Sequence, residues 1–380
     1  MTRKQATFIT IALILALALT FLIYGSRLTP ETPSAPAPTS TSEPTNLPEP
    51  IAVPVATDVS EATGADFAPH PNNPVLAPGA PGSWDSETVF NSRVVFKDGI
   101  YHMFYNGSSS LVLETIAIGY ATSRDGQSFT RHTSSPILEG DETGFDALQV
   151  GTGVPIMEDD TWILYYNAGS GPGPGKTIGR ATSPNPSGPW TRNREPILVA
   201  GRPGEWDSEF IMPDSIIATG GGYVMYYSGG AGWPEGTTAI GMATSPDGLT
   251  WTKYDDPGTT DSPFAESDPV LQSGDPSHWD FASVWGCTVL KTAHGWEMLY
   301  TGSDTKRVQI GYATSLDGIH WTKFEDNPIL TPEIEPMLSE GALPILQSPS
   351  VIVKDSTYTV YYDYGVSTGG IGVATGVIPK

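Results

Sequence analysis

The sequence predicts an all-β protein: a five-bladed β-propeller of four-stranded antiparallel blades, preceded by one N-terminal transmembrane helix and a disordered linker. Three observations support this prediction. A short string recurs five times, tight Asp-Gly turns follow three of its copies, and Gly (42) and Pro (35) are abundant among the 380 residues. Because the interior of a long helix tolerates neither Gly nor Pro, the composition argues against an all-α fold.

Residues 1–27 are predicted to anchor the chain in a membrane. Arg3 and Lys4 precede seventeen uncharged residues, 8–24. A spanning helix needs about 17–25 apolar residues, whereas the apolar part of a secretion signal has about 7–15. We therefore expect an uncleaved anchor with its basic end inside, and an extracytoplasmic protein tethered to the cell membrane. The alternative is a cleaved signal and a secreted protein.

Residues 28–64 are rich in Pro, Thr and Ser and contain eight prolines. Proline removes a backbone donor and fixes φ, so this segment is expected to be a spacer without packed elements. The third and last segment, residues 65–380, is predicted to form the propeller.

The repeated string is Ile-Gly-x-Ala-Thr-Ser, or a close variant of it. Its alanines stand at steps of 60, 62, 70 and 61 residues, which divides the chain into five units. Each unit has an apolar stretch, an aromatic strand such as residues 101–105, the repeated string, and a short strand after an Asp-Gly turn. Asp-Gly between two strands is a strong hairpin signal. Four-stranded units repeated radially are the blades of a propeller.

The two ends of the chain are predicted to close the ring. The fifth unit ends after its third strand, near Thr375, with no Asp-Gly turn and no fourth strand. Residues 67–76 match residues 129–138, where the first unit has its fourth strand. Residues 67–71 are therefore expected to supply the outermost strand of the fifth blade.

Chemistry is expected at the mouth of the central channel, where the first strand of each blade begins. Four blades carry an aromatic-Asp pair there, including Asp85 and Asp146, and two of these continue to a glutamate, Glu87 and Glu209. Hydrolysis of a glycosidic bond needs two carboxyl groups, one to protonate the leaving oxygen and one to activate water or attack carbon. The alternative is that the repeated Asp builds its own turn while the aromatic packs between blades.

Other residues near the mouth differ from blade to blade, so symmetry does not explain them. They are candidates for substrate binding, and the two tryptophans among them could stack on a sugar ring or simply pack between blades. These residues are Asn91, Arg93, Gln149, Asp214, Trp233 and Trp285.

Charge and cysteine content limit the partners. With 42 acidic and 19 basic side chains the net charge is −23, which disfavours nucleic acid. The lone Cys287 cannot form an intrachain disulfide, and the six histidines have no metal-like spacing, so we expect no metal and no cofactor. The expected partner is a carbohydrate, the membrane is contacted only through the N-terminal helix, and the protein is expected to be a monomer.

The pattern Gly-x-Ala-Thr-Ser-x-Asp-Gly-x-x-Trp-Thr, followed by Pro-Ile-Leu, resembles the five-bladed propeller superfamily of arabinanases, β-xylosidases, invertases and mannoside phosphorylases. The resemblance covers residues 64–380. It implies an acidic base or nucleophile from blade one (Asp85 or Glu87), a modulating Asp from blade two (Asp146) and a general acid from blade three (Glu209).

The sequence departs from the superfamily where its members often carry Asp-Pro. Blades one and two have Asn91-Ser92 and Thr152-Gly153 instead, and blade three has Pro213-Asp214. The resemblance implies a glycoside hydrolase-like protein that cleaves oligo- or polysaccharides. The departures allow two interpretations: the carboxylates have moved to the Trp-Asp-Ser-Glu positions, or the propeller has lost hydrolysis and only binds. The alternatives to the hydrolase are therefore a non-catalytic carbohydrate-binding propeller and a protein-interaction propeller.

Overall fold

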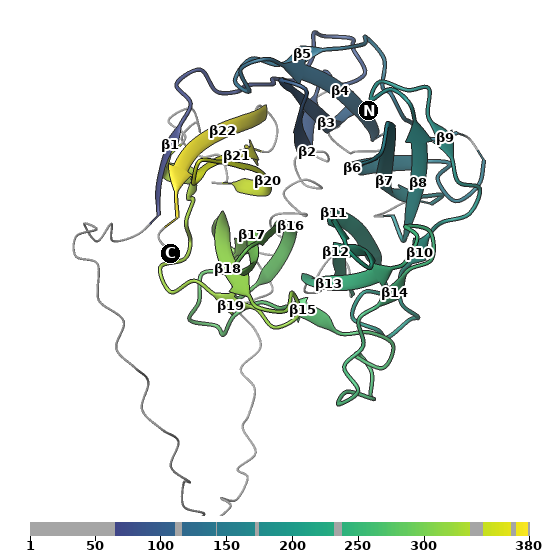
Figure 1. Ribbon diagram of the computed structural model, residues 1–380, viewed down its shortest axis with the longest axis vertical. Coiled ribbons are helices and arrows are strands. Elements are labelled where there is room, and N and C mark those ends of the chain that lie inside the picture. Colours follow the sequence, from purple (N-terminus) through teal and green to yellow (C-terminus); the bar gives the residue numbers. More distant parts are fainter. Residues whose placement is uncertain are drawn as a thin grey trace, which may run out of the picture.

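The computed structural model describes residues 65–110, 116–141, 143–171, 175–231, 238–334, 345–365 and 370–378. Five antiparallel sheets are arranged around a central axis, as Figure 1 shows, and the predicted five-bladed propeller is confirmed. The predicted helix at residues 8–24 and the linker at 28–64 lie outside the described residues. Within the described part of the chain, no helix has the length and apolar character to cross a membrane.

The blades follow one another in chain order, and the first strand of each lies nearest the axis (Figure 1). Blade one is β2 (Thr88–Lys97), β3 (Ile100–Ser108), β4 (Ala117–Ser123) and β5 (Thr130–Arg131). Blade two is β6 (Gln149–Glu158), β7 (Thr161–Gly169), β8 (Thr177–Ser183) and β9 (Thr191–Arg192). Blade three is β11 (Phe210–Thr219), β12 (Gly222–Gly230), β13 (Thr238–Ser245) and β14 (Thr252–Lys253). Blade four is β16 (Ser283–Thr292), β17 (Gly295–Ser303), β18 (Val308–Ser315) and β19 (Thr322–Lys323).

Blade five closes the ring with strands from both ends of the chain. It contains β20 (Leu346–Lys354), β21 (Thr357–Tyr364), β22 (Gly370–Val377) and, on its outer edge, β1 (Asp66–Pro69). Phe67 lies opposite Gly376 in the antiparallel register. The predicted closure is therefore confirmed, although β1 starts one residue earlier and ends two residues earlier than the predicted 67–71.

The apolar segment after each fourth strand adds a further contact to the third strand, which the sequence analysis did not predict. It forms β10 (Leu198–Val199) against β8 and β15 (Pro269–Leu271) against β13. In the other blades the same segment makes isolated bridges, such as Leu138 with Ile118. A short 3-10 helix, η1 (Pro332–Ile334), follows this segment in blade four.

The core lies between neighbouring blades rather than within them. Phe104 and Ile118 of blade one pack with Leu164 and Tyr166 of blade two in one buried cluster, and each of the other blade interfaces has a similar cluster. Burying these aromatic faces stabilises the ring by the hydrophobic effect. The glycine of the repeated string is required here, because a side chain at Gly241 would place its Cβ 2.5 Å from the ring of Tyr227.

The Asp-Gly turns lie on the face opposite the loops that join second to third strands, and we call these the bottom face and the mouth face. In the turn of blade one, Asp125 accepts hydrogen bonds from the N–H groups of Gln127 and Ser128. Gly126 takes a positive φ of 74°, and its carbonyl accepts the hydroxyl of Tyr361 from blade five at 2.9 Å. These turns therefore join blades and have a structural role.

Candidate functional site

The four aspartates at the beginnings of the first strands share one set of contacts. Asp85 accepts hydrogen bonds from the hydroxyl of Tyr105 (3.1 Å) and from Nε of Arg131 (2.7 Å). The Tyr lies on the second strand, and the basic residue, an Arg or a Lys, lies on the fourth; 'base' here means this positively charged side chain. We call this arrangement the Asp–Tyr–base module. In the other three blades its members are Asp146 with Tyr166 and Arg192, Asp207 with Tyr227 and Lys253, and Asp280 with Tyr300 and Lys323.

The position of the Arg or Lys on the fourth strand indicates that the module has a structural role. The fourth strand is the outermost of each blade, so the carboxylate joins the loop before the first strand to the outer edge of the sheet. Asp85 and Asp146 are buried like their counterparts Asp207 and Asp280. Burial, together with the adjacent carboxylate, raises the pKa of Tyr105 and keeps its hydroxyl a donor. The contacts thus describe a brace that is repeated in four blades.

The two glutamates of the predicted catalytic set lie on the rim. Glu209 forms an ion pair with Lys176 of blade two at 3.0 Å, with side chains 43% and 55% exposed. Glu87 is exposed. No hydrogen bond or ion pair between described residues joins any two of Asp85, Glu87, Asp146 and Glu209. Their catalytic roles stay predictions.

The remaining predicted binding residues divide between the strand ends and the channel. Gln149 is half-buried at the start of β6, and Trp285 is half-buried in β16, one residue before a bulge. Trp233 lies outside the described residues. Asn91, Arg93 and Asp214 come together in the channel, around the bulges of the first strands.

Each first strand has a β-bulge at the same height in the ring. The register of pairing shifts between Phe90 and Arg93 in β2, and the same shift occurs once in each of β6, β11, β16 and β20. A bulge bends its strand and re-aims a side chain. Four bulges contain a residue with positive φ, namely Asn91 (50°), Thr152 (48°), Gly286 (53°) and Ser348 (56°).

A side chain from the second strand of the preceding blade holds each of these four bulges. Its oxygen accepts the backbone N–H of the bulged residue, and we call these contacts the latch ring. The pairs are Asn106 with Thr152 (2.7 Å), Ser228 with Gly286 (2.7 Å), Thr301 with Ser348 (2.9 Å) and Asp363 with Asn91 (2.9 Å).

Blade three is the exception, for a chemical reason. Its bulge contains Pro213, which has no N–H to donate and cannot take a positive φ. The amide of Asn167, at the equivalent position on β7, instead donates to the carbonyl of Ile211 at 2.7 Å. The bulge therefore differs in shape, and it carries the carboxyl of Asp214.

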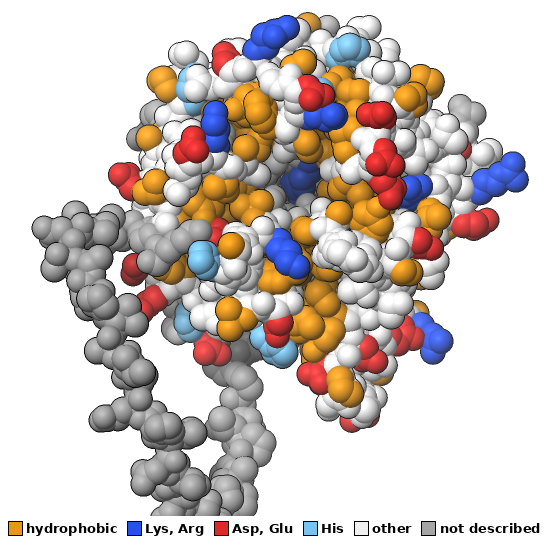
Figure 2. Space-filling view, viewed as in Figure 1, with side chains coloured by type: hydrophobic (Ala, Val, Ile, Leu, Met, Phe, Trp, Pro, Cys, Tyr) orange, Lys and Arg blue, Asp and Glu red, His pale blue; other side chains and the backbone are white. Residues whose placement is uncertain are grey.

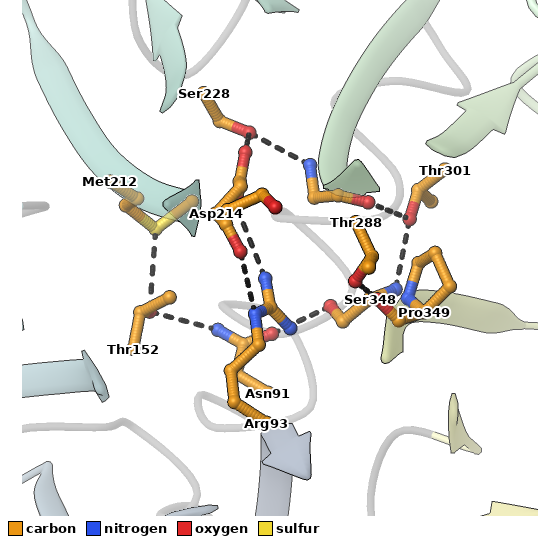
Figure 3. Close-up of polar contacts among 12 residues, drawn as sticks. Asn91, Arg93, Thr152, Met212, Asp214, Ser228, Thr288, Thr301, Ser348 and Pro349 are labelled. Carbon is orange, nitrogen blue, oxygen red and sulfur yellow. Dashed lines mark hydrogen bonds and ion pairs between the residues drawn. The ribbon is translucent and has the colours of Figure 1, made fainter. Parts of the chain in front are cut away.

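Arg93 and Asp214 point toward one another in the middle of the ring (Figure 3). Nη2 of Arg93 lies 3.3 Å from Oδ1 of Asp214, and its Nε donates to the Asp214 carbonyl at 2.9 Å. Ser228 donates to Oδ2 of Asp214 at 2.5 Å. Figure 2 shows the molecule along the same axis as Figure 1, with a hollow at its centre and a basic side chain visible inside.

Neutral polar groups surround this ion pair. The amide of Asn91 donates to Thr152 at 3.2 Å and accepts the hydroxyl of Ser348 at 2.6 Å, so it bridges three blades (Figure 3). Hydroxyl and amide groups of this kind can bind the hydroxyl groups of a sugar. Among the described residues, no group of three His, Cys, Asp or Glu side chains is arranged to hold a metal ion.

Two carboxyl groups in the channel have raised proton affinities. Burial raises the pKa of Asp214 to about 6, although Arg93 and Ser228 oppose the rise. Burial raises the pKa of Asp363 to about 7, with the N–H of Asn91 and the charge of Arg93 opposing it. Carboxyls that hold a proton near neutral pH can act as proton donors.

Asp363 was not among the residues selected from the sequence. The signal was nevertheless present, because the second strands carry Tyr-Asn, Tyr-Asn, Tyr-Ser, Tyr-Thr and Tyr-Asp at equivalent positions, starting at Tyr105, Tyr166, Tyr227, Tyr300 and Tyr362. Only the fifth of these pairs ends in an ionisable residue. Aligning the second strands, as the first strands were aligned, would have found it.

Fold and channel together define a five-bladed β-propeller with buried carboxyl groups on its axis. No protein-family profile matches the chain. The 1,2-beta-oligomannan phosphorylase of Thermoanaerobacter sp. (strain X514) is 30% identical over 314 residues, which are 80% of this chain and 94% of that protein. The chain therefore belongs to the five-bladed propeller family of mannoside phosphorylases and glycoside hydrolases, GH130.

Solved structures agree on the fold. One represents the GH130 family of mannoside phosphorylases, which contains glycoside hydrolases that target β-1,2-mannosidic linkages in Candida mannan. It has a TM-score of 0.63 at 18% identity and covers 83% of this chain and 95% of its own. The β-1,2-mannobiose phosphorylase from Listeria innocua has a TM-score of 0.61 at 18% identity, covering 82% of this chain and 96% of its own.

Proposed function

We propose that the chain is an extracytoplasmic glycoside hydrolase that cleaves β-1,2-mannosidic bonds at the mouth of its channel, with Asp214 protonating the leaving oxygen. The observation that carries the proposal is the buried carboxyl of Asp214 at the centre of the ring, fixed by Arg93 and Ser228. Its raised pKa of about 6 favours the protonated form that a general acid needs. The location rests on the predicted N-terminal anchor.

The substrate class rests on the family. The relatives act on β-1,2-linked mannosides by name, and the neutral polar groups around Asn91 suit the hydroxyls of a sugar. The net charge of −23 is compatible with an uncharged substrate.

Electrostatics favour hydrolysis over phosphorolysis. Within the polar network described around the channel, Arg93 is the positive group, and it is already paired with Asp214. An incoming phosphate would have to displace the Asp214 carboxyl from Arg93 and approach a second carboxyl at Asp363, at a cost in desolvation and, whenever either carboxyl is ionised, in repulsion. Water has no such cost.

The proposed reaction exchanges one bond at the anomeric carbon. The oxygen of water bonds to that carbon, the bond to the leaving oxygen breaks, and the proton of Asp214 passes to the leaving oxygen. A second carboxylate takes the proton of water from the other face of the sugar. The rim residues Glu87 and Glu209 are the candidates for it.

The first test uses β-1,2-mannobiose with and without inorganic phosphate. We expect free mannose as the product in both cases, at rates that do not depend on phosphate. Mannose 1-phosphate as the main product, formed only with phosphate present, would show that the protein is a phosphorylase.

The second test assigns the acid by comparing Asp214→Asn with Glu209→Gln. We expect Asp214→Asn to lose about 10²–10⁴-fold in kcat/KM on mannobiose, but much less on an aryl mannoside whose leaving group needs no proton. Glu209→Gln should show no such dependence on the leaving group. The opposite pattern would favour the assignment of Glu209 that the superfamily resemblance implies.

A second candidate function is mannoside binding without catalysis. The observation in its favour is that the bulges of blades one and two carry the neutral residues Asn91 and Thr152, where superfamily members often have Asp. Titration calorimetry that detects mannobiose binding by a parent protein with no turnover would support this candidate over the hydrolase.

A further inference from the structure

We propose that Ser228 is a positioning residue of the channel, whose hydroxyl ties the carboxyl of Asp214 to the bulge of blade four and lets that carboxyl release its proton more readily. The effect on catalysis rests on the proposed function, whereas the effect on the proton affinity of Asp214 does not. Three observations lead to this inference: the two hydrogen bonds of Ser228, the partners of the equivalent hydroxyl in blade four, and the groups that surround Asp214.

The hydroxyl of Ser228 bonds to two blades at once. Ser228 lies on β12, and its Oγ donates to Oδ2 of Asp214 on β11 at 2.5 Å (Figure 3). The same Oγ accepts the N–H of Gly286 on β16 at 2.7 Å. Ser228 is 0% exposed and Asp214 is 2% exposed. Because a buried polar group left unmatched costs free energy, the hydroxyl is held between these two partners.

The equivalent hydroxyl in blade four shows what differs in blade three. Oγ1 of Thr301 accepts the N–H of Ser348 at 2.9 Å and donates to the carbonyl of Gly286 at 3.2 Å. Both of these partners are backbone groups. In blade three the bulge contains Asp214, and its carboxyl accepts the proton of the Ser228 hydroxyl instead. A contact that joins backbone groups in blade four therefore also holds an acid in blade three.

Two ionisable groups lie next to Asp214. Arg93 on β2 forms the ion pair with it. Cys287 on β16 is fully buried, which raises the pKa of its thiol well above the usual value and keeps the thiol neutral near pH 7. Substitution of Ser228 changes neither group, so its effect on Asp214 can be separated from theirs.

The other strands packed against β11 present neutral groups to this bulge. The side chains of β6 and β7 that contact its neighbourhood are Thr152 and Asn167. Arg180, the charged residue of β8, is paired in register with Tyr165 and acts on that tyrosine. A change in the titration of Asp214 would therefore not originate in these three strands.

The hydroxyl of Ser228 favours the ionised form of Asp214. A hydrogen bond donated to a carboxylate is stronger than one donated to a neutral carboxyl, so this bond opposes the burial that raises the pKa of Asp214 to about 6. Removing the hydroxyl should raise that pKa further, by about one unit. Ser228 thus keeps the proton of Asp214 available for transfer.

The first experiment is a double-mutant cycle that needs no substrate. The Tm values of the parent, Ser228→Ala, Asp214→Asn and the double variant are measured between pH 5 and pH 8. The pKa of folded Asp214, about 6, lies above the ordinary value of 3.8, so this group makes the parent less stable as pH rises between these values. In Ser228→Ala this decrease should continue to higher pH. The Tm gap between the parent and Ser228→Ala should therefore widen by about 2 °C from pH 5 to pH 8.

The Asp214→Asn background removes the titrating group. In that background Ser228→Ala should lower Tm by the same amount at pH 5 and at pH 8. Asp363, whose pKa is about 7, titrates in the same range, but it is unchanged in all four proteins and its contribution cancels. A Tm gap that stays constant with pH, or one that widens equally in both backgrounds, would overturn the proposal.

Two further variants separate the hydroxyl from the latch. Thr301→Val removes the equivalent hydroxyl of blade four and breaks the latch on Ser348, so it should lower Tm equally at all these pH values. Ser228→Thr keeps the hydroxyl, and its Tm gap to the parent should not change with pH. If Ser228→Ala does not fold, Ser228→Cys replaces it, because a thiol is a weaker donor and should shift the titration in the same direction. A gap that widens as much in Thr301→Val as in Ser228→Ala would contradict the assignment.

Activity provides the second readout. In Ser228→Ala the alkaline limb of the kcat/KM profile on β-1,2-mannobiose should move to higher pH by about one unit, while the limb of Thr301→Val stays in place. An unmoved limb in Ser228→Ala, with the widening Tm gap present, would show that Asp214 is not the acid and that the proposed function fails. An unmoved limb without the widening gap would overturn the role of Ser228. If the parent does not turn over mannosides, the cycle alone decides that role.

Discussion

The Asp–Tyr–base modules and the latch ring are both repeated around the propeller, but they differ in what is repeated. The modules repeat the residues: Asp and Tyr recur four times with a base, 46 residues after the Asp in three cases. The latch ring repeats the contact while the residues change, from Asn106 to Ser228, Thr301 and Asp363. An acid that recurs with its partners indicates a structural role. An acid at a position that is elsewhere neutral is not explained by the contact that the positions share.

The largest expected effect on stability comes from breaking a module. In Asp207→Asn the ammonium of Lys253, 13% exposed and 2.6 Å from the carboxylate, loses its counter-charge. Leaving one half of a buried ion pair costs about 3–5 kcal/mol. Denaturant unfolding should show this loss in the free energy of unfolding.

A double variant serves as its control. Adding Lys253→Met removes the unmatched charge and should restore a large part of the stability. If Asp207→Asn alone costs less than about 1 kcal/mol, the modules are not braces and the contrast with the latch ring is lost.

An intermediate effect is expected from breaking a latch. Asn106→Ala leaves the N–H of Thr152 without its acceptor inside the ring. The expected cost is about 1–3 kcal/mol, because a buried donor then has no partner. Chemical denaturation measures it, and a loss as large as that of Asp207→Asn would show that the two regions do not differ in stability.

The smallest effect is expected at the rim. Lys176→Met removes the ion pair with Glu209, in which both side chains are largely exposed. Exposed pairs contribute about 0–1 kcal/mol, and salt screens them further. We expect a change in the free energy of unfolding below about 0.5 kcal/mol, and a change above 2 kcal/mol would mean that the rim pair is more buried in solution.

The fold could be predicted because an internal repeat can be recognised in a single sequence. The recurring Ile-Gly-x-Ala-Thr-Ser string and the match of residues 67–76 to 129–138 were sufficient for the blade number and the closure. The extra strands β10 and β15 were not predicted. Each is only two or three residues long and is defined by pairing with the third strand, so the sequence carries little signal for it.

The site was predicted less completely, for two physical reasons. Asn91, Arg93 and Asp214 were selected because they break the symmetry of the first strands, and the structure brings these three together. The pairing of Asp85 with Arg131 was missed because it joins a loop to an outer strand 46 residues away. Asp363 was missed because only the first strands were compared, whereas the latch ring lies between the second strands and the next blade.

The outer strand of blade five also determines how the molecule would be presented at a surface. Asp66 pairs with Val377 at the bottom end of β22, so the chain joins the propeller on the face opposite the mouth. A propeller tethered through the predicted spacer would therefore hold its channel away from the membrane and open to large glycans outside. Tension on that tether would act first on the hydrogen bonds between β1 and β22, which also hold the ring closed.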